Sequence, residues 1–198
     1  MLTLGEIAAE PELLTWRLRL RDGTPAALRP LEHGDARALA AFLGGLSAET
    51  RRLSTYDGYD LAAARELCAA IARYDKLRLV LEVASGAVAG LVEFSLAIMP
   101  DDIARYAAAG VRLSEHSDLR FGITLADAYQ GQGVGSAVFP LVEDVARRLG
   151  RSRIILWGGV LTDNARAIRF YEKNGFLRVG SATGSSGRES IDMIRELG

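Results

Sequence analysis

Apolar and polar residues along this chain follow two periods, one typical of strands and one typical of helices. Alternation of apolar and basic residues predicts a strand at Trp16–Arg21. The turn signal Asp22-Gly23 follows, and a second strand is predicted after it at Pro25–Leu31. Because Pro25 cannot donate a ladder hydrogen bond, the second strand is expected at a sheet edge. A helical pattern ended by Gly44-Gly45 then predicts a helix at 33–42. Ser47 with Thr50 predicts a short helix at 47–52, and an alanine- and leucine-rich segment predicts a third at 60–72.

The rest of the chain also mixes strands with helices. Two Val- and Leu-rich segments, 77–83 and 88–98, predict a β-hairpin. Further elements are expected as helices at 103–109, 133–149 and 164–173, and as strands at 119–125, 153–160, 176–179 and 190–195, with a flexible connection at 180–187. Hairpins together with a strand–helix–strand unit predict a single α/β (α+β) domain whose mixed sheet is flanked by helices.

Composition and charge narrow the class of protein. Of the 198 residues, 49% are hydrophobic and 25% are charged, as in an ordinary globular domain. A net charge of −1 gives no electrostatic case for a nucleic acid or an anionic membrane as partner. No apolar segment approaches the roughly 20 residues that span a bilayer, and the first 20 residues carry no secretory signal.

Cysteine and histidine usage excludes two kinds of site. The single Cys68 rules out an internal disulfide and suits a reducing, cytoplasmic location. The two histidines, His33 and His116, lie far apart without spaced partners. The sequence therefore predicts no metal site.

The strongest local signal is a glycine-rich segment, Gln130–Ser136, between a predicted strand and a predicted helix. Glycines let the backbone approach a ligand closely, and the first N–H groups of a helix bind phosphate well. The dinucleotide fingerprint of Rossmann folds matches imperfectly, because Ser136 stands where its last Gly or Ala belongs, and a Walker A loop is absent. A tight turn without a ligand is the alternative.

A second segment, Asn164 to Phe176, follows the next strand. Asn164 and Tyr171 are seven residues apart, which on a helix places both side chains on one face, about 10 Å from each other. Such a face could line an extended ligand. Taken alone, Tyr171 is better explained as a core aromatic residue with a satisfied hydroxyl.

In this order and spacing, the two segments resemble those of the GNAT superfamily of N-acetyltransferases. Gln130-x-x-Gly133-x-Gly135 is similar to its phosphate loop, and Phe170-Tyr171-Glu-Lys-Asn-Gly-Phe with Asn164 is similar to its second cofactor element. The resemblance covers about residues 24–196. It implies a GNAT domain at 24–198, with a mostly antiparallel, twisted sheet, behind an N-terminal extension at 1–23 that carries an extra strand.

The resemblance also implies acetyl-CoA, with its coenzyme A moiety, as co-substrate. Asn164 would hydrogen-bond the pantetheine arm, and Tyr171 would protonate the leaving thiolate. The strand end at Ile123 and Leu125 would pair with the same arm. Main-chain amides would hold the diphosphate along the loop, at Gln130, Gly131, Gln132, Gly133, Val134, Gly135 and Ser136.

The sequence departs from the family at the general base. Many members carry Glu ten residues before the loop's Gln, and Arg120 stands there in this chain. Glu93 on the preceding strand is the first substitute. Glu115, His116 and Asp118 are further ones. Alternatively the amine arrives neutral and the enzyme supplies mainly positioning.

Three functions are therefore weighed. The first is an N-acetyltransferase that transfers the acetyl group to a primary amine by direct attack in a ternary complex, the acceptor being a small molecule or a protein lysine or N-terminus. The second is a catalytically silent CoA or acyl-CoA sensor, and the third a Rossmann-type nucleotide-binding module. Candidate acceptor walls are 47–60, the insert 100–117, which could equally be surface decoration, and 180–187. The oligomer stays open, though a homodimer is common in the family.

Overall fold

The computed structural model describes residues 1–54, 56–183 and 187–198. The chain divides into two compact units. The N-terminal unit comprises residues 2–93 and 123–138, and the C-terminal unit comprises Met1 with residues 94–122 and 139–198. Within the described ranges, no helix is both long and apolar enough to cross a membrane.

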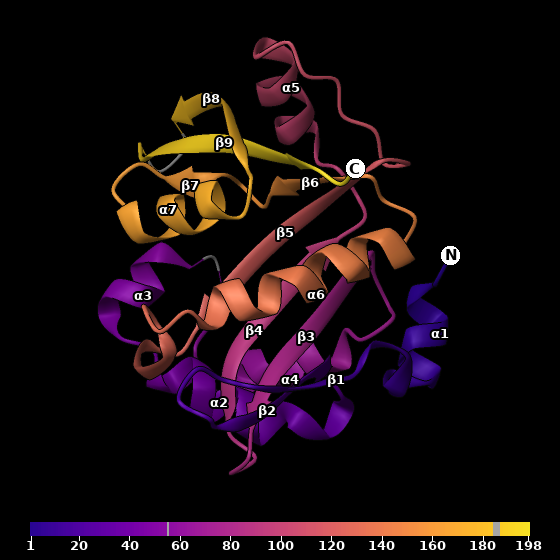
Figure 1. Ribbon diagram of the computed structural model, residues 1–198, viewed down its shortest axis with the longest axis vertical. Helices are drawn as coiled ribbons and strands as arrows, with labels where there is room; N and C mark the ends of the chain where they lie inside the picture. The colour runs from indigo at the N-terminus through magenta and orange to yellow at the C-terminus, as the bar shows by residue number, and fades with distance from the viewer. Residues whose placement is uncertain (55, 184–186) are drawn as a thin grey trace. The chain divides into compact units, whose positions relative to one another are not determined.

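The strands of the N-terminal unit pair in chain order. They are β1 (Trp16–Arg19), β2 (Pro25–Pro30), β3 (Lys76–Val83) and β4 (Val88–Ser95). β2 pairs antiparallel with both β1 and β3, and a turn closed by a 2.8 Å bond from Gly86 N to Val83 O joins β3 to β4. Figure 1 shows β2, β3 and β4 running side by side.

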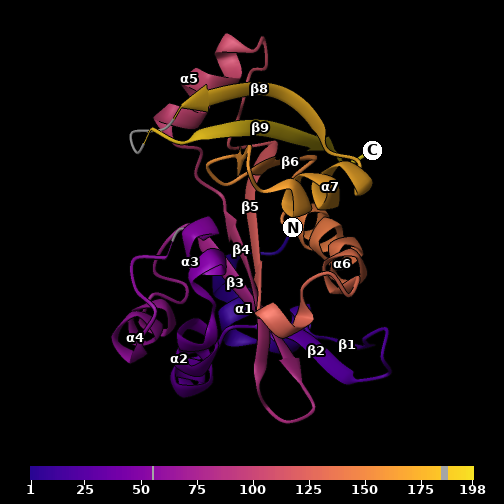
Figure 2. The same ribbon diagram turned by 90° about the vertical axis from the view of Figure 1, so that its left-hand side faces the viewer.

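Helices of the N-terminal unit bury the apolar face of these strands. α2 (Ala36–Gly45) packs against α4 (Leu61–Ala69), and Leu39, Phe42 and Cys68 form one core cluster with Val80 and Leu91 of the strands. Figure 2 shows both helices on one side of the strand layer. The short elements are α1 (Leu4–Ala9), η1 (Pro11–Leu14), η2 (His33–Asp35), α3 (Ala48–Leu53) and η3 (Asp127–Tyr129).

The C-terminal unit is organised around β9 (Glu189–Glu196). This strand pairs antiparallel with β6 (Arg153–Leu156), β7 (Val160–Leu161) and β8 (Leu177–Thr183), whereas β6 pairs parallel with β5 (Asp118–Leu125). The helices are α5 (Pro100–Ala108), which packs on β8 in Figures 1 and 2, and α7 (Ala165–Lys173). The helix α6 (Val134–Arg148) belongs to this unit from residue 139 onward, and its residues 134–138 belong to the N-terminal unit. The predicted mixed, mostly antiparallel sheet with flanking helices is confirmed.

Two strand predictions are wrong. β2 is not an edge strand, because β1 pairs with it on its outer side; Pro25 is tolerated as the first residue of the strand. The predicted strand 153–160 is two strands, β6 and β7, since Gly158 and Gly159 turn the chain with φ of +74° and +77°.

The structure also changes the predictions for the N-terminal residues and for the connection at 180–187. The N-terminal helix α1 was not predicted, although Thr3 and Glu6 form a capping box at its start. The extra strand expected in the N-terminal extension is present as β1. β8 continues to Thr183, so part of the connection predicted at 180–187 is strand, and residues 184–186 lie outside the described part of the chain.

Candidate active site

The glycine-rich segment forms a loop between η3 and α6. Gly131 and Gly133 have φ of +73° and +81°, a conformation that residues with a Cβ adopt only with strain. A Cβ atom built at either position would meet no atom within 4 Å. The glycines are therefore required by backbone shape, and the space beside them is open.

Six consecutive backbone N–H groups in this loop and helix start, those of residues 131–136, have no acceptor among the described residues. The first helical bond begins one residue later, from Ala137 N to Gly133 O at 3.0 Å. Unpaired N–H groups at the positive end of a helix attract anions. The loop therefore offers a preformed set of donors for a phosphate or diphosphate.

Gln130 differs from its neighbours in the loop. Its N–H, which the sequence assigned to the diphosphate, is instead bonded to Asp127 O at 3.2 Å. Its side-chain amide donates to Leu125 O at 2.7 Å and to Thr50 Oγ1 at 3.1 Å. Gln130 therefore supports the loop from inside the protein.

The end of β5, where the sequence places the pantetheine arm, is partly exposed from Gly122 to Leu125. The carbonyl oxygen of Leu125 already accepts a hydrogen bond from the Gln130 side chain, so this acceptor is partly used before any ligand binds. β4 comes very close here, since a Cβ on Gly90 would lie 2.7 Å from Leu125 Cδ2 and 3.2 Å from Thr124 O. Gly90 therefore permits this strand contact.

The second predicted cofactor segment lies in the C-terminal unit. Asn164 is the N-cap of α7, with φ −89° and ψ 64°, and its Oδ1 accepts from Ala167 N at 3.1 Å. Asn164 thus stands at the start of the helix, where its carbonyl accepts the first helical hydrogen bond, from Ile168 N at 3.0 Å. Because Oδ1 is used in the cap, the side-chain NH2 group is the part of Asn164 that is left to bond a ligand.

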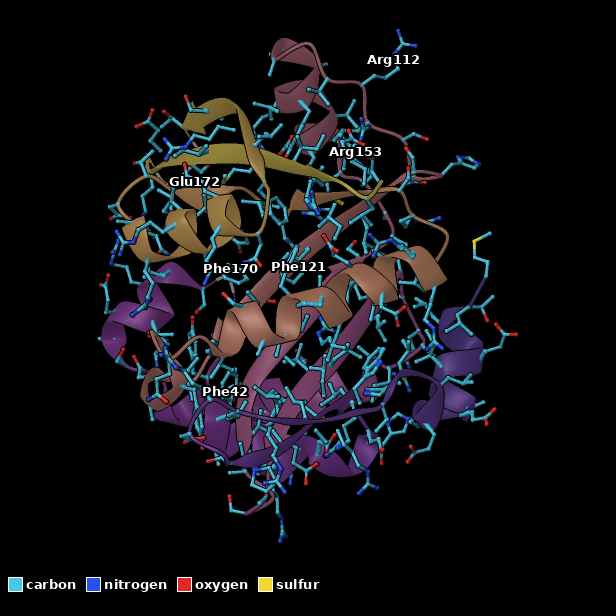
Figure 3. The ribbon with its side chains drawn as sticks, viewed as in Figure 1. Phe42, Arg112, Phe121, Arg153, Phe170 and Glu172 are labelled. Carbon is cyan, nitrogen blue, oxygen red and sulfur yellow. The ribbon has the colours of Figure 1, made fainter. Side chains whose placement is uncertain are left out.

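Tyr171 packs within an aromatic cluster of the C-terminal unit. Its ring lies edge-on to Phe121 and Phe176, with centroids 6.3 Å and 5.2 Å away; Figure 3 labels Phe121 and the neighbouring Phe170. The side chain is 8% exposed, and burial raises the pKa of its phenol. The hydroxyl has no hydrogen-bond partner within the described chain. The ring is a core residue, and the hydroxyl is uncommitted.

Glu93, the first substitute base, lies in the N-terminal unit beside Arg78. Their side chains are 16% and 11% exposed, with 2.8 Å between Arg78 Nε and Glu93 Oε1. Tyr56 approaches the same pair: burial, and secondarily the charge of Glu93, raise the pKa of its phenol, which also bonds to Thr124. Tyr56 follows residue 55, which lies outside the described residues. The phenol of Tyr56 is thus near enough to Glu93 to feel the charge of its carboxylate, and its bond to Thr124 holds it beside the end of β5.

Arg120, at the family's usual base position, belongs to a buried ionic cluster in the C-terminal unit. Its Nε lies 2.8 Å from Asp102 Oδ2, and its guanidinium lies over the Trp157 ring, 4.7 Å from the centroid. Arg105 pairs with Asp102 at 2.7 Å and with Asp192 at 3.1 Å. Asp102 of the insert 100–117 is therefore part of the core of this unit, while most residues of the insert are exposed.

The other three candidate bases, Glu115, Asp118 and His116, lie in the C-terminal unit and make structural contacts. Glu115 Oε1 accepts from Ile98 N at 3.1 Å. Asp118 is fully buried and paired with Arg153. His116 is exposed, and its backbone N–H bonds to Ser114 Oγ. Glu93 remains the candidate that its surroundings favour.

Comparison with known proteins places this chain in a family. Residues 49–176, about two thirds of the chain, match the Acetyltransferase (GNAT) family. The chain belongs to the GNAT family of acetyltransferases. It is thus an acyltransferase, and its fold matches that assignment. No curated protein sequence matches this acetyltransferase.

Solved structures support the same fold for the GNAT enzyme. The GNAT domain of PAT from S. lividans is 22% identical, with a TM-score of 0.69 over 94% of this chain and 99% of that one. Ribosomal-protein-S5-alanine acetyltransferase from Vibrio fischeri is 13% identical, with a TM-score of 0.70 over 92% and 97%. Spermidine N-acetyltransferase from Vibrio cholerae, solved with CoA and spermine, is 22% identical, with a TM-score of 0.64 over 87% and 95%.

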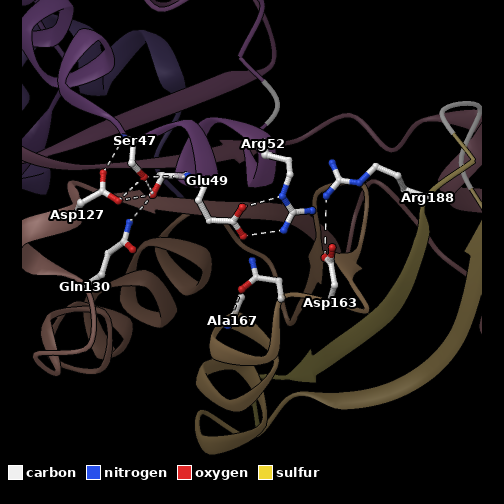
Figure 4. A network of polar contacts seen from close by, with 10 residues as sticks. Ser47, Glu49, Arg52, Asp127, Gln130, Asp163, Ala167 and Arg188 are labelled. Atoms are coloured by element: carbon white, nitrogen blue, oxygen red, sulfur yellow. Dashed lines mark hydrogen bonds and ion pairs between the residues drawn. The ribbon is translucent and has the colours of Figure 1, made fainter.

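Sequence patterns missed one group of residues at this acetyltransferase's loop. Asp127 accepts hydrogen bonds from Ser47 and Thr50, which lie 80 and 77 residues earlier (Figure 4). The sequence predicts Ser47 at the start of a helix but does not predict its bond to Asp127. Contacts over such a separation carry no local signal.

Proposed function

We propose that this GNAT enzyme transfers the acetyl group of acetyl-CoA to a primary amine by direct attack in a ternary complex. The observation that carries the proposal is the run of six unpaired N–H groups at residues 131–136. These donors suit the diphosphate of coenzyme A. The V. cholerae neighbour, solved with CoA and spermine, supports the same pairing of cofactor and amine.

Glu93 is proposed as the base at the acceptor end. A lysine-like amine is mostly protonated at pH 7 and must lose a proton before it attacks the thioester carbon. Glu93 Oε1 is held by Arg78, and Oε2 has no hydrogen-bond partner within the described ranges. Glu93 would take the amine proton on Oε2, directly or through water, while the nitrogen lone pair forms the new C–N bond.

Tyr171 is proposed as the acid that completes the transfer. As the C–S bond breaks, its electron pair stays on sulfur, and the resulting thiolate takes the phenol proton. The second proton of the acylated nitrogen leaves to water, and the Tyr171 phenolate regains its proton from water. Burial raises the pKa of Tyr171, so the group is protonated at neutral pH. Its hydroxyl has no other partner among the described residues, so the proton is not committed to a structural bond. The products are the acetylated amine and free CoA.

The acceptor is an amine of a small molecule or of a protein. Neighbours of both kinds support this breadth, since one is named for spermidine and another for the alanine of a ribosomal protein. The acceptor walls are proposed on the α3–α4 connection, around Tyr56 and Glu93.

A CoA or acyl-CoA sensor is the second candidate. It is favoured by one observation: Arg120 occupies the usual base position and is engaged by Asp102. Such a sensor would bind CoA and release no thiol with any amine.

Two measurements test the proposed function. Ligand at 100 times its dissociation constant stabilises the folded state by about 2.7 kcal/mol. CoA and acetyl-CoA should therefore raise the melting temperature, and NAD should not. Free thiol released from acetyl-CoA is then measured over a panel of amines and lysine peptides. Thiol release supports the transferase, CoA binding without release over the whole panel supports the sensor, and a response to NAD alone overturns both.

A further inference from the structure

Asp127 joins two parts of the N-terminal unit that are distant in sequence. Its Oδ2 accepts from Ser47 N at 2.9 Å, and its Oδ1 accepts from Ser47 Oγ at 2.6 Å and from Thr50 Oγ1 at 2.7 Å. Ser47 Oγ in turn accepts from Thr50 N at 3.1 Å and caps α3. The start of α3 is therefore bonded to a carboxylate of η3, as Figure 4 shows.

Thr50 extends these bonds to the glycine-rich loop. Its side chain is buried, and because its single hydroxyl proton goes to Asp127, its oxygen accepts from Gln130 Nε2 at 3.1 Å. The second proton of the same amide goes to Leu125 O at 2.7 Å. Gln130 thus uses both amide protons, a task that a carboxylate of the same size could not perform.

These hydrogen-bonded residues connect to both the cofactor loop and the proposed acceptor walls. On one side, Gln130 directly precedes the unpaired N–H groups of residues 131–136. On the other side, α3 leads into Ser54, whose hydroxyl lies 2.7 Å from Tyr59 OH, and Tyr59 lies edge-on to Tyr56. A displacement of α3 would therefore alter the support of the loop, and a displacement of the loop would alter α3.

We propose that Asp127 is a positioning residue that couples the acceptor-side helix α3 to the cofactor loop. This inference rests on the proposed function. Because coupling is reciprocal, CoA bound at the loop stabilises the arrangement of α3, and loss of Asp127 weakens CoA binding without removing any group that touches CoA. An ordinary helix cap would affect stability alone.

The test compares Asp127→Asn with a matched exposed aspartate, Asp22→Asn. Asp22 lies in the β1–β2 turn, where its Oδ1 accepts from Thr24 N at 2.9 Å, and it is also exposed. The dissociation constant for CoA is measured by calorimetry, and the melting temperature by scanning calorimetry. Asp127→Asn should weaken CoA binding about 2- to 30-fold. Asp22→Asn should alter at most the melting temperature and leave CoA binding unchanged.

A second variant keeps the proposal testable if Asp127→Asn does not fold. Gln130→Glu retains side-chain size but removes both amide donors, and it should weaken CoA binding in the same direction. A foldable Asp127→Asn that binds CoA like the wild type, or an unchanged Gln130→Glu in its place, overturns the positioning role alone. A wild-type protein that does not bind CoA overturns the proposed function and, with it, this inference.

Discussion

Asp102 of α5 pairs with Arg120 of β5, with 2.8 Å between Oδ2 and Nε, and both side chains are buried. Asp102 also pairs with Arg105 at 2.7 Å. The Asp102 carboxylate is therefore shared between the guanidinium groups of Arg105 and Arg120. Arg120, which stands at the usual base position, is thus held by a residue of the insert 18 positions earlier in the chain. This relationship gives the first prediction.

Asp102→Asn should lower the free energy of unfolding by about 3–5 kcal/mol, because it leaves two guanidinium groups with insufficient compensation. Denaturant unfolding measures the change. The control is Asp101→Asn, an exposed neighbour on the first turn of the same helix, which should cost less than about 1 kcal/mol. Equal losses in the two variants would contradict the importance of the buried cluster.

Gly133→Ala should weaken CoA binding and destabilise the protein by about 1–2 kcal/mol, since its φ of +81° disfavours any Cβ. Gly23→Ala is the matched control. Gly23 has φ of +86°, and an added Cβ there also meets no atom within 4 Å. The control should lose similar stability and bind CoA normally in calorimetry; a Gly133→Ala protein that also binds normally would remove the loop from the proposed site.

Tyr171→Phe should leave stability nearly unchanged, because the aromatic contacts with Phe121 and Phe176 remain and the hydroxyl has no partner in the described chain. Loss of a general acid should slow thiol release about 100-fold or more, with CoA binding retained. Tyr74→Phe, at an exposed tyrosine, is the control. An unchanged rate would exclude Tyr171 from proton transfer.

Glu93→Gln should reduce the rate with a protonated amine about 100-fold or more while CoA affinity stays constant. Glu82→Gln removes a comparable charge, since Glu82 pairs with Arg29 at 2.7 Å, and should react like the wild type. Steady-state rates with one amine acceptor measure both. Equal activity of the two variants would favour an amine that arrives neutral and is merely positioned.

Asp127 should contribute a pH-dependent part of stability. Hydrogen bonds from Ser47, with Thr50 contributing, lower its pKa to about 2, below the roughly 3.9 of an unfolded Asp. A lowered carboxyl pKa stabilises the fold above pH 4, and this stabilisation disappears as the pH falls from about 4 to 2. The difference in unfolding free energy between wild type and Asp127→Asn should shrink over that window. A constant difference would show that the charge of Asp127 is irrelevant.

The sequence by itself determined most elements and the family. The period of apolar residues predicted α6 within a few residues, because an amphipathic helix carries its own burial pattern. Composition and helix-ending signals predicted α4 and α7 equally closely. Spacing in the segment from Gln130 to Ser136 predicted a loop rich in free N–H groups, since glycine conformations and helix starts are local properties.

Tertiary structure alone decided which polar side chains were left for chemistry. Only the fold pairs Arg120 with Asp102, Glu93 with Arg78 and Asp127 with Ser47. The Asn164 cap and the turn at Gly158-Gly159, by contrast, are local features that the sequence patterns did not predict. Ion pairs and hydrogen bonds between distant residues depend on three-dimensional distance, on which local sequence periodicity carries no information.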